Sequence, residues 1–371
     1  MNALDSQLCL ALHSIPHVGD TLLARLFLHY GVAQAIWDSD PVHWAGLGAR
    51  PEAIHAACIA RRNPNHWSQV EAQWETLTRL NARVVALSDD DYPALLRTIY
   101  DPPPLLYVRG NAGLLSEAQL AVVGSRKASP AGRRAARLLS AGAVQAGLHI
   151  SSGLALGIDG EAHQAALDAG GASIAVMATG VDKVYPARHR GLAEDIVNSG
   201  CLVTEFALGS GPDRFRFPRR NRILSGLSLG VLVVEAALRS GSSITAGAAL
   251  EQGREVFAVP WSMFHEGGKG CLRLIREGAK MVEQLSDIVE ELGPLYCLQN
   301  DLRGGQESVD TFAAEASPDQ RCIDAMVGYE AIAVDELVRQ SSLPVTRVVA
   351  ALASLELVQR VSRCSGGYIH S

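Results

Sequence analysis

The sequence of 371 residues has little aromatic content, at 5%, and no excess of positive charge, since its formal net charge is −6 at pH 7. This charge excludes a protein that binds nucleic acid through a surface that is basic all round, so any site for phosphates must be a local patch. No apolar run approaches the ~20 residues that a membrane-spanning helix needs. The first residues, MNALDSQLCLALHSIP, have no basic segment before their apolar stretch, and we therefore expect no signal peptide.

Sequence patterns of several enzyme and metal-protein classes are also missing. The seven cysteines are odd in number, scattered and without a CxxC pair. That pattern indicates reduced thiols in a cytoplasm and neither a disulfide framework nor a zinc site. Ser125, Ser152 and Ser240 stand outside the GxSxG and SxxK patterns of nucleophilic serines. We therefore expect a cytoplasmic protein without a cofactor.

The first 82 residues of the chain are typical of a small all-helical domain. Leu8, Leu12 and Ile15 keep helical spacing, and the segment 16–20, PHVGD, predicts a sharp turn before a second helix. Helix, glycine-bearing turn, helix is the outline of a helix-hairpin-helix, whose backbone N–H groups can hold a DNA phosphate. A looser copy covers residues 47–54. DNA contact and simple packing both remain open, because a histidine occupies the place of the motif's first glycine.

Residues 83–293 alternate short apolar runs with amphipathic helices, which predicts an α/β domain with a doubly wound, mostly parallel sheet. The runs are nearly all apolar, as expected of strands covered on both faces. We expect strands at Ala121–Gly124, His149–Ser152, Ser173–Ala178, Cys201–Phe206, Gly230–Glu235 and Glu255–Val259.

The loop GSRKAS follows the first of these strands and precedes a helix expected to begin near Ser129. Ligands of such sheets bind at the carboxyl ends of the strands. The loop is neither GxGxxG nor a Walker loop. Its backbone N–H groups and the helix dipole nevertheless predict a phosphate site at Gly124 and Ser125, which Arg126 closes.

The segment 213–222, DRFRFPRRNR, places five arginines and two phenylalanines in ten residues. We interpret it as a loop, because Pro218 is expected to prevent a helix from passing through it. Arginines interleaved with aromatic rings suit a strand of phosphates whose bases are free to stack. The alternatives are a solvated loop and a set of internal ion pairs. Glu205 and Glu235 each end a strand, and we expect them to hold the arginines of the neighbouring loop in place instead of acting as a catalytic pair.

Asp159 and His163 are four residues apart at the start of a predicted helix. This spacing fits a metal site. We favour the alternative, in which Asp159 caps the helix and His163 packs or forms a hydrogen bond, and we expect no metal.

The end of the chain is interpreted as a linker at 294–317 and a winged-helix domain at 318–371. The linker segment has no hydrophobic periodicity. After it, the order helix, turn, helix and β-hairpin is that of a winged helix. Arg347 is the single base on its would-be recognition helix, Val345–Leu355, so contact with a protein and contact with DNA both remain open.

With these segments in view, the whole chain resembles the DNA-processing protein A (DprA/Smf) family, most densely between residues 92 and 288. The resemblance is carried by AVVGSRKAS at 121–129, SSGLALGIDGEAHQAAL at 151–167, GVDKVYP at 180–186, FPRRNRILSGLS at 217–228, VVEAALRSGSSITA at 233–246 and GREVFAVP at 253–260. It implies an N-terminal SAM-like domain, an extended Rossmann-like domain and a C-terminal winged helix.

The resemblance also implies a function without catalysis. Members of the family bind and protect single-stranded DNA, help to displace single-stranded-DNA-binding protein and load RecA in natural transformation. They form a homodimer through the Rossmann-like domain. The site carries over to Gly124, Ser125, Arg126, Arg188, Phe217, Arg219, Arg220, Asn221 and Arg222. The alternative is an enzyme acting on a nucleotide or nucleoside phosphate, although SGSSITAGAALE lacks the GGxGT of related phosphoribohydrolases.

Overall fold

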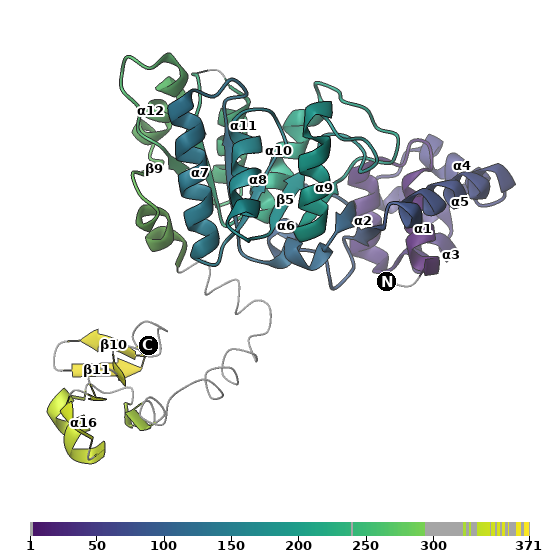
Figure 1. The fold of residues 1–371 in the computed structure, drawn as a ribbon. Coiled ribbons are helices and arrows are strands. Elements are labelled where there is room, and N and C mark those ends of the chain that lie inside the picture. Colours follow the sequence, from purple (N-terminus) through teal and green to yellow (C-terminus); the bar gives the residue numbers. More distant parts are fainter. Residues whose placement is uncertain are drawn as a thin grey trace. The chain divides into compact units, whose positions relative to one another are not determined.

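The computed structural model describes residues 3–238 and 240–293 and, farther along, residues 322–323, 326–327, 332–341, 343–345, 347–348, 351–352, 355, 361–364 and 367–370. The chain divides into two compact units, Met1–Gln299 and Asn300–Ser371, and each is described by itself (Figure 1).

The N-terminal part of the first unit is all-helical, as its periodicity predicts. Its elements are α1 (Ala3–His13), α2 (Asp20–Tyr30), α3 (Ala33–Asp38), η1 (Pro41–Leu47), α4 (Pro51–Ala60) and α5 (Pro64–Arg79). Three of them begin with proline. Proline has no backbone N–H, and this costs nothing there, because an N–H at the first position of a helix has no partner inside the helix. Leu8, Leu12 and Ile15 are buried, as predicted.

The two glycine-bearing turns of this part lie where the sequence places them. His17 has φ +64°, so a histidine adopts here the left-handed backbone that usually favours glycine. Gly48 has φ +92° between η1 and α4. Both turns therefore keep the helix-hairpin-helix outline, and their contact with DNA stays a prediction.

A sheet of nine strands forms the centre of the first unit, in the order β1-β2-β6-β5-β4-β3-β7-β8-β9. From β6 to β9 all neighbours are parallel, whereas β1 and β2 add antiparallel pairs at one edge. The strands are β1 (Ala82–Ala86), β2 (Leu105–Gly110), β3 (Gln119–Gly124), β4 (His149–Ser152), β5 (Ser173–Val176), β6 (Cys201–Thr204), β7 (Gly230–Glu235), β8 (Glu255–Ala258) and β9 (Lys280–Met281).

All six predicted strands are confirmed, with small differences at their ends. The strands β1, β2 and β9 were not predicted. The sequence around β9 carries little signal because this strand has only two residues. The remaining helical elements are α6 (Ala94–Arg97), η2 (Ala112–Ser116), α7 (Pro130–Gln145), α8 (Ile158–Asp168), η3 (Ala187–His189), α9 (Arg190–Ser199), α10 (Arg216–Leu227), α11 (Gly241–Glu251), η4 (Glu266–Gly268) and α12 (Lys269–Arg276).

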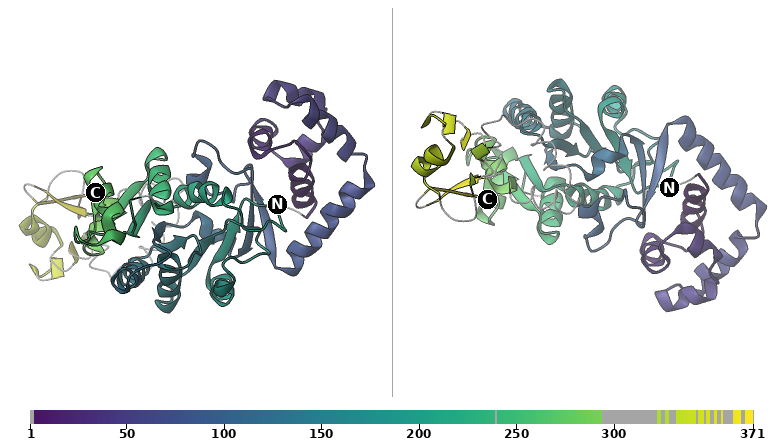
Figure 2. Two further views of the ribbon diagram at one scale, coloured as in Figure 1. Left: turned by 90° about the horizontal axis from the view of Figure 1, so that it is seen from above. Right: turned by 90° about the horizontal axis from the view of Figure 1, so that it is seen from below.

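Helices cover both faces of this sheet (Figure 2). Leu120 and Val122 of β3 pack in one core cluster with residues of α7 and α8. Ala121 and Val123 pack in the other with residues of α10 and α11. Successive side chains of a strand point to opposite faces, so the unbroken apolar runs of the sequence follow from this double cover.

The order of the strands reverses at β3, which lies between β4 and β7. The chain continues from β3 through α7 to β4 on one side, whereas β7 lies on the other and leads into α11. The loops after β3 and β7 therefore diverge. In sheets of this kind that divergence opens a crevice at the carboxyl ends of the strands.

The second unit has a small core and a β-hairpin. Its described elements are α16 (Val334–Ser341), helical residues between 345 and 355, and the antiparallel strands β10 (Val361–Cys364) and β11 (Gly367–His370). Helix, turn, helix and hairpin is the predicted order. The predicted linker at 294–317 lies outside the described residues, and the three predicted boundaries, after residues 82, 293 and 317, stay predictions. In the described part of the chain no helix is long and apolar enough to cross a membrane.

Candidate nucleic-acid interface

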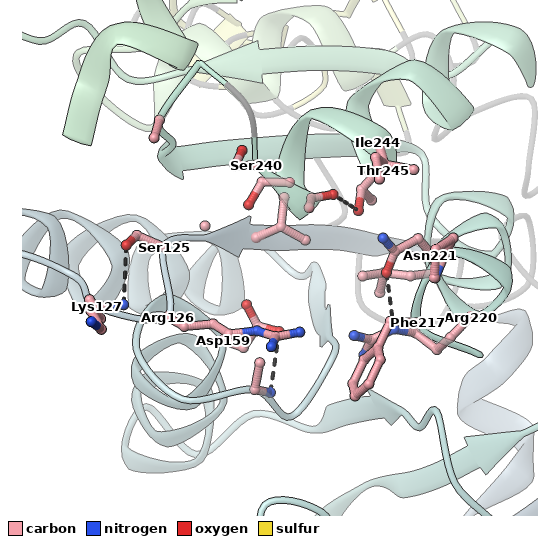
Figure 3. Close-up of a pocket in the computed structure, with 18 residues that line it drawn as sticks. Ser125, Arg126, Lys127, Asp159, Phe217, Arg220, Asn221, Ser240, Ile244 and Thr245 are labelled. Atoms are coloured by element: carbon pink, nitrogen blue, oxygen red, sulfur yellow. Dashed lines mark hydrogen bonds between the residues drawn. The ribbon is translucent and has the colours of Figure 1, made fainter. Parts of the chain in front are cut away.

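A pocket of about 550 Å³ opens at the switch point of the sheet, and we call it the crevice. Four segments line it: the loop after β3, the segment from the loop after β4 into α8, the first turns of α10, and the start of α11 with the loop before it. Figure 3 shows these side chains around the open space, among them Arg126, Asp159, Phe217, Asn221 and Ser240. The loop GSRKAS and the arginine segment are thus brought together, as the sequence analysis predicts.

The arginine segment is not a loop throughout, because α10 begins at Arg216 and includes Pro218. The prediction that Pro218 prevents a helix is wrong. This proline lies in the first turn, where backbone N–H groups have no partner inside the helix, so its missing N–H costs nothing. The helix turns by about 100° per residue, and the four residues from Arg219 to Arg222 consequently point in different directions.

Arg220 and Asn221 are buried in the wall of the crevice. Arg220 donates from Nη1 to the carbonyl of Val176 at 2.7 Å and from Nε to Asn221 Oδ1 at 3.1 Å. Burial lowers the pKa of Arg220, and the charge of Asp159 opposes this effect. Burial also raises the pKa of Asp159, against the charge of Arg220. The two residues therefore stabilise each other's charged form inside the wall.

Glu205 holds the other two arginines, as predicted. Its Oε2 accepts from Arg222 Nη2 at 2.5 Å and from Arg219 Nη2 at 3.2 Å. Asp20 of α2 takes a second ion pair with Arg219 at 2.5 Å, and Asp101 lies 3.0 Å from Arg222 Nε. The side chain of Arg219 stays 47% exposed, whereas that of Arg222 is 13% exposed. Only the first is open to a ligand on a large part of its surface.

Glu235, in contrast, holds none of the arginines that the structure describes, and for these the prediction is wrong. Its carboxylate accepts from the backbone N–H of Ser129 at 3.0 Å and from Ser129 Oγ at 2.6 Å. A buried carboxylate needs donors, and the N-terminus of α7 provides them together with its dipole.

Two backbone N–H groups of the loop GSRKAS, where the phosphate site is predicted, are paired inside the protein. The N–H of Ser125 donates to the carbonyl of Glu235 at 2.7 Å, and that of Lys127 to Ser125 Oγ at 3.1 Å. A Cβ at Gly124 would lie 2.5 Å from Ile158, so this glycine permits close packing. The loop therefore presents its side chains, not these N–H groups, to a ligand.

The most accessible part of the interface is an arginine stacked on an aromatic ring. The guanidinium carbon of Arg126 lies 5.0 Å from the ring centroid of Phe217, and Tyr185 contacts the same ring edge-on at 6.1 Å. Together with Arg214 they line a second hollow, of about 480 Å³, that we call the rim hollow. Phe215 is 66% exposed beside Arg214. Cations over exposed rings are typical of sites where bases stack and phosphates pair.

Two of these rim residues, Tyr185 and Arg214, are absent from the predicted site. The sequence signal for Tyr185 lies in the motif GVDKVYP, and Arg214 stands inside the arginine segment itself. Arg188, which was predicted, is exposed and lines a groove that also contains Arg126.

His163 is buried and pairs through Nδ1 with Ser173 Oγ at 2.7 Å, as the structural interpretation predicts. Burial lowers its pKa to about 3. Asp159 does not cap its helix: its Oδ2 accepts from the N–H groups of Gly153 and Ala155 at 3.1 and 3.3 Å, which orders the preceding loop. No cluster of three or more His, Cys, Asp or Glu side chains suited to a metal occurs in the described part of the chain.

The fold and the site define a Rossmann-like protein with an arginine- and aromatic-lined crevice at the switch point of its sheet. The model of a family described as DNA recombination-mediator protein A matches residues 83–293, and a DprA winged helix domain matches residues 310–367. The chain therefore belongs to the DNA recombination-mediator protein A family, that is, the DprA/Smf family.

Two relatives show how much of the chain is shared with known proteins. Protein Smf of Escherichia coli strain K12 is 38% identical over 98% of this chain and 96% of its own length. DNA processing protein DprA of Streptococcus pneumoniae strain R6 is 46% identical over 56% of this chain and 73% of its own.

Two solved structures have similar folds. That of DprA from S. pneumoniae has a TM-score of 0.67 at 36% identity and covers 76% of this chain and 96% of that one. That of DNA processing protein A from Helicobacter pylori, described for its single-stranded DNA binding mode, has a TM-score of 0.53 at 25% identity, over 58% and 97%.

Proposed function

We propose that the protein binds single-stranded DNA at the carboxyl edge of its sheet and delivers the strand to RecA. The observation that carries this proposal is the stack of the exposed Arg126 on the half-buried ring of Phe217, with the exposed Tyr185 at its edge. A guanidinium pairs with phosphate, and a ring stacks on a base at about 1–3 kcal/mol per base. The single-stranded DNA bound by the H. pylori relative supports the same ligand here.

The nine predicted site residues divide by their exposure. Arg126, Arg188 and Arg219 are exposed, and we assign them to phosphates, with Phe217 as the stacking ring. The remaining five are assigned to the shape and charge of the crevice: Gly124, Ser125, Arg220, Asn221 and Arg222.

The family resemblance supports the finer parts of the proposal. The protein would act in the cytoplasm as a homodimer formed by the Rossmann-like domain. It would protect incoming strands in natural transformation, displace single-stranded-DNA-binding protein and load RecA, without a catalytic step of its own.

The first experiment is fluorescence anisotropy of a labelled oligo-dT over a salt series, with a duplex of equal length alongside. We expect salt-sensitive binding that favours the single strand, because phosphate contacts release counterions and free bases can stack. Replacing Arg126→Ala and Arg188→Ala together should lower the log–log salt slope by about 1.4, at roughly 0.7 per lost phosphate contact.

The matched control is Arg79→Ala/Arg83→Ala. It removes the same charge from exposed arginines outside the site. An equal loss of slope in this control, or a preference for the duplex, would contradict the assignment. RecA delivery is then measured as the lag before RecA forms filaments on a strand covered by single-stranded-DNA-binding protein. If the protein binds DNA but leaves that lag unchanged, only the delivery step fails.

One observation keeps the enzymatic alternative in view. The crevice, at about 550 Å³, has the size of a small-molecule site and contains Asp159. The segment from Ser240 that opens α11 lacks GGxGT, which argues against hydrolysis. Release of free base from nucleoside monophosphates by the purified protein would favour this alternative over DNA delivery.

A further inference from the structure

A third hollow, of about 660 Å³, lies on the α7 and α8 side of the loop GSRKAS, and we call it the α7–α8 groove. Five cationic side chains line it, against the single carboxylate of Glu161: Arg126, Lys127, Arg133, Arg137 and Arg188. Five positive charges less one negative charge leave an excess of four. The formal net charge of the whole chain is −6, so this concentration of positive charge is local.

Two of these arginines come from one face of α7. Arg133 and Arg137 are four residues apart, a spacing at which like charges repel and disfavour a helix. Glu161 of α8 offsets this repulsion, because its carboxylate accepts from Arg133 Nη1 at 2.9 Å and from Arg137 Nε at 2.5 Å. Glu161 is 12% exposed, whereas the arginines are 49% and 61% exposed. The carboxylate therefore fixes both guanidinium groups while a large part of each stays open to a ligand.

The groove is continuous with the crevice. Arg126 and Lys127 line both hollows, and Arg126 also lines the rim hollow. The groove lies along α7 and α8, which are side by side in Figure 1. A strand that occupies the crevice can therefore continue over the loop GSRKAS into the groove.

The lining of the groove suits phosphates and not bases. Among the described residues that line it none is Phe, Tyr or Trp, in contrast to the rim hollow with its two rings. Among these described residues the one aromatic ring is the imidazole of His189, which is half-buried and paired through Nδ1 with the carbonyl of Leu154 at 2.9 Å. The groove therefore offers little platform for base stacking, whereas a planar guanidinium matches a phosphate through two parallel hydrogen bonds.

We propose that the α7–α8 groove is a second phosphate track, in which Arg133 and Arg137 hold the backbone of a DNA strand that continues beyond the crevice. The proposal rests on the proposed function and adds a subsite to it. Binding in this track is independent of base identity, sensitive to salt, and open only to strands long enough to reach it.

The test compares the wild type with Arg133→Ala/Arg137→Ala on oligo-dT strands from about 4 to about 16 nucleotides long, the range of common site sizes. On the longest strands the variant should lose about 1.4 in log–log salt slope, at roughly 0.7 per phosphate. Between about 50 and 200 mM salt, the affinity of the variant for these strands should therefore fall by a factor about seven times smaller than the affinity of the wild type. On the shortest strands the two proteins should bind alike.

Three further variants complete the test. Arg79→Ala/Arg83→Ala removes the same charge elsewhere and should leave the length dependence intact. Arg133→Lys/Arg137→Lys keeps the charge and should restore most of the slope. Thermal denaturation checks folding, and if the double alanine variant does not fold, Arg137→Ala alone replaces it, with half the loss of slope.

The outcomes separate this inference from the proposed function. If the wild type binds every length and the alanine variant equals it throughout, the second track is overturned and the crevice site stands. Equal losses on short and long strands would also overturn it, because the arginines would then belong to the crevice. Failure of the wild type to bind any strand would overturn both.

Discussion

Neighbouring arginines of α10 have different surroundings and therefore different roles. The side chain of Arg219 is 47% exposed, Arg220 is 5% exposed, and the side chain of Arg222 is 13% exposed against the buried carboxylate of Glu205. Burial raises the pKa of Glu205, and the charges of Arg222 and Arg219 oppose that effect. Sequence alone treats these guanidinium groups as equivalent, whereas the structure makes one accessible and two internal.

This difference predicts opposite responses to two substitutions. Arg222→Ala should destabilise the fold by about 3 kcal/mol, because it leaves the buried Glu205 without its shorter ion pair. Arg219→Ala should lower the stability by about 1 kcal/mol or less, because the ion pairs of Arg219 are half-exposed. It should weaken binding to oligo-dT more than Arg222→Ala does. Urea denaturation and fluorescence anisotropy of both variants measure the two effects. Equal losses of stability would refute the distinction.

Elements from distant parts of the chain meet at very close range around the crevice. Gly153 follows β4, and a Cβ built there would lie 1.9 Å from Nη1 and 2.4 Å from Cζ of Arg220 in α10. The guanidinium of Arg220 donates hydrogen bonds to Val176 and Asn221, so it cannot move away without breaking these buried hydrogen bonds.

Gly153→Ala should therefore destabilise the protein by about 1–3 kcal/mol, the usual cost of overpacking. It should also weaken DNA binding by displacing the first turns of α10. The control is Gly191→Ala in α9, where a Cβ meets nothing within 4 Å. Thermal denaturation compares the two variants. A Gly153→Ala protein as stable as the control would show that α10 shifts freely.

At the scale of the first unit, the helical part and the sheet are joined through one core and one ion network. The same hydrophobic cluster includes Leu8 of α1, Tyr107 of β2 and Leu224 of α10. His13 contacts Tyr107 Oη at 2.8 Å and Asp20 at 3.3 Å, and Asp20 pairs in turn with Arg219. The N-terminal helices are thus part of the structural support of the proposed DNA site.

The ionisation of Asp20 gives this connection a pH dependence. Burial alone would raise its pKa, but hydrogen bonds and charges from His13 and Arg219 outweigh burial and lower the pKa from 3.8 to about 2. A depressed carboxyl pKa contributes stability above the ordinary pKa, and that contribution is lost as the pH falls from about 4 to about 2.

Asp20→Asn should therefore lower the melting temperature at neutral pH and flatten its fall between about pH 4 and pH 2. The same change should raise the affinity for oligo-dT, because Arg219 loses a competing carboxylate. Thermal denaturation over a pH series measures the first effect, and Asp91→Asn, at an exposed ion pair with Arg83, is the control. If the melting temperature of Asp20→Asn falls between about pH 4 and pH 2 as steeply as that of the wild type, the ionised Asp20 does not stabilise the fold as described.

The sequence by itself determined the helical N-terminal part, the six central strands, the switch-point loops and the family. These features follow from local periodicity and contiguous motifs, which are properties of short stretches of chain. It also predicted that Glu205 holds arginines, because a carboxylate at a strand end beside a cationic segment has few other partners. Where it failed, as with Pro218 and Glu235, the outcome depended on where a helix begins and which N–H groups it presents.

Only the tertiary structure decided which arginines face solvent and which carboxylates hold them. Asp20 and Arg219 are 199 residues apart in the chain, and Arg137 and Glu161 are 24 apart on separate helices. No local pattern encodes such pairs, because burial and partner choice are set by the packing of elements against one another. For the same physical reason the α7–α8 groove, formed by side chains of four separate segments, becomes visible only in the folded chain.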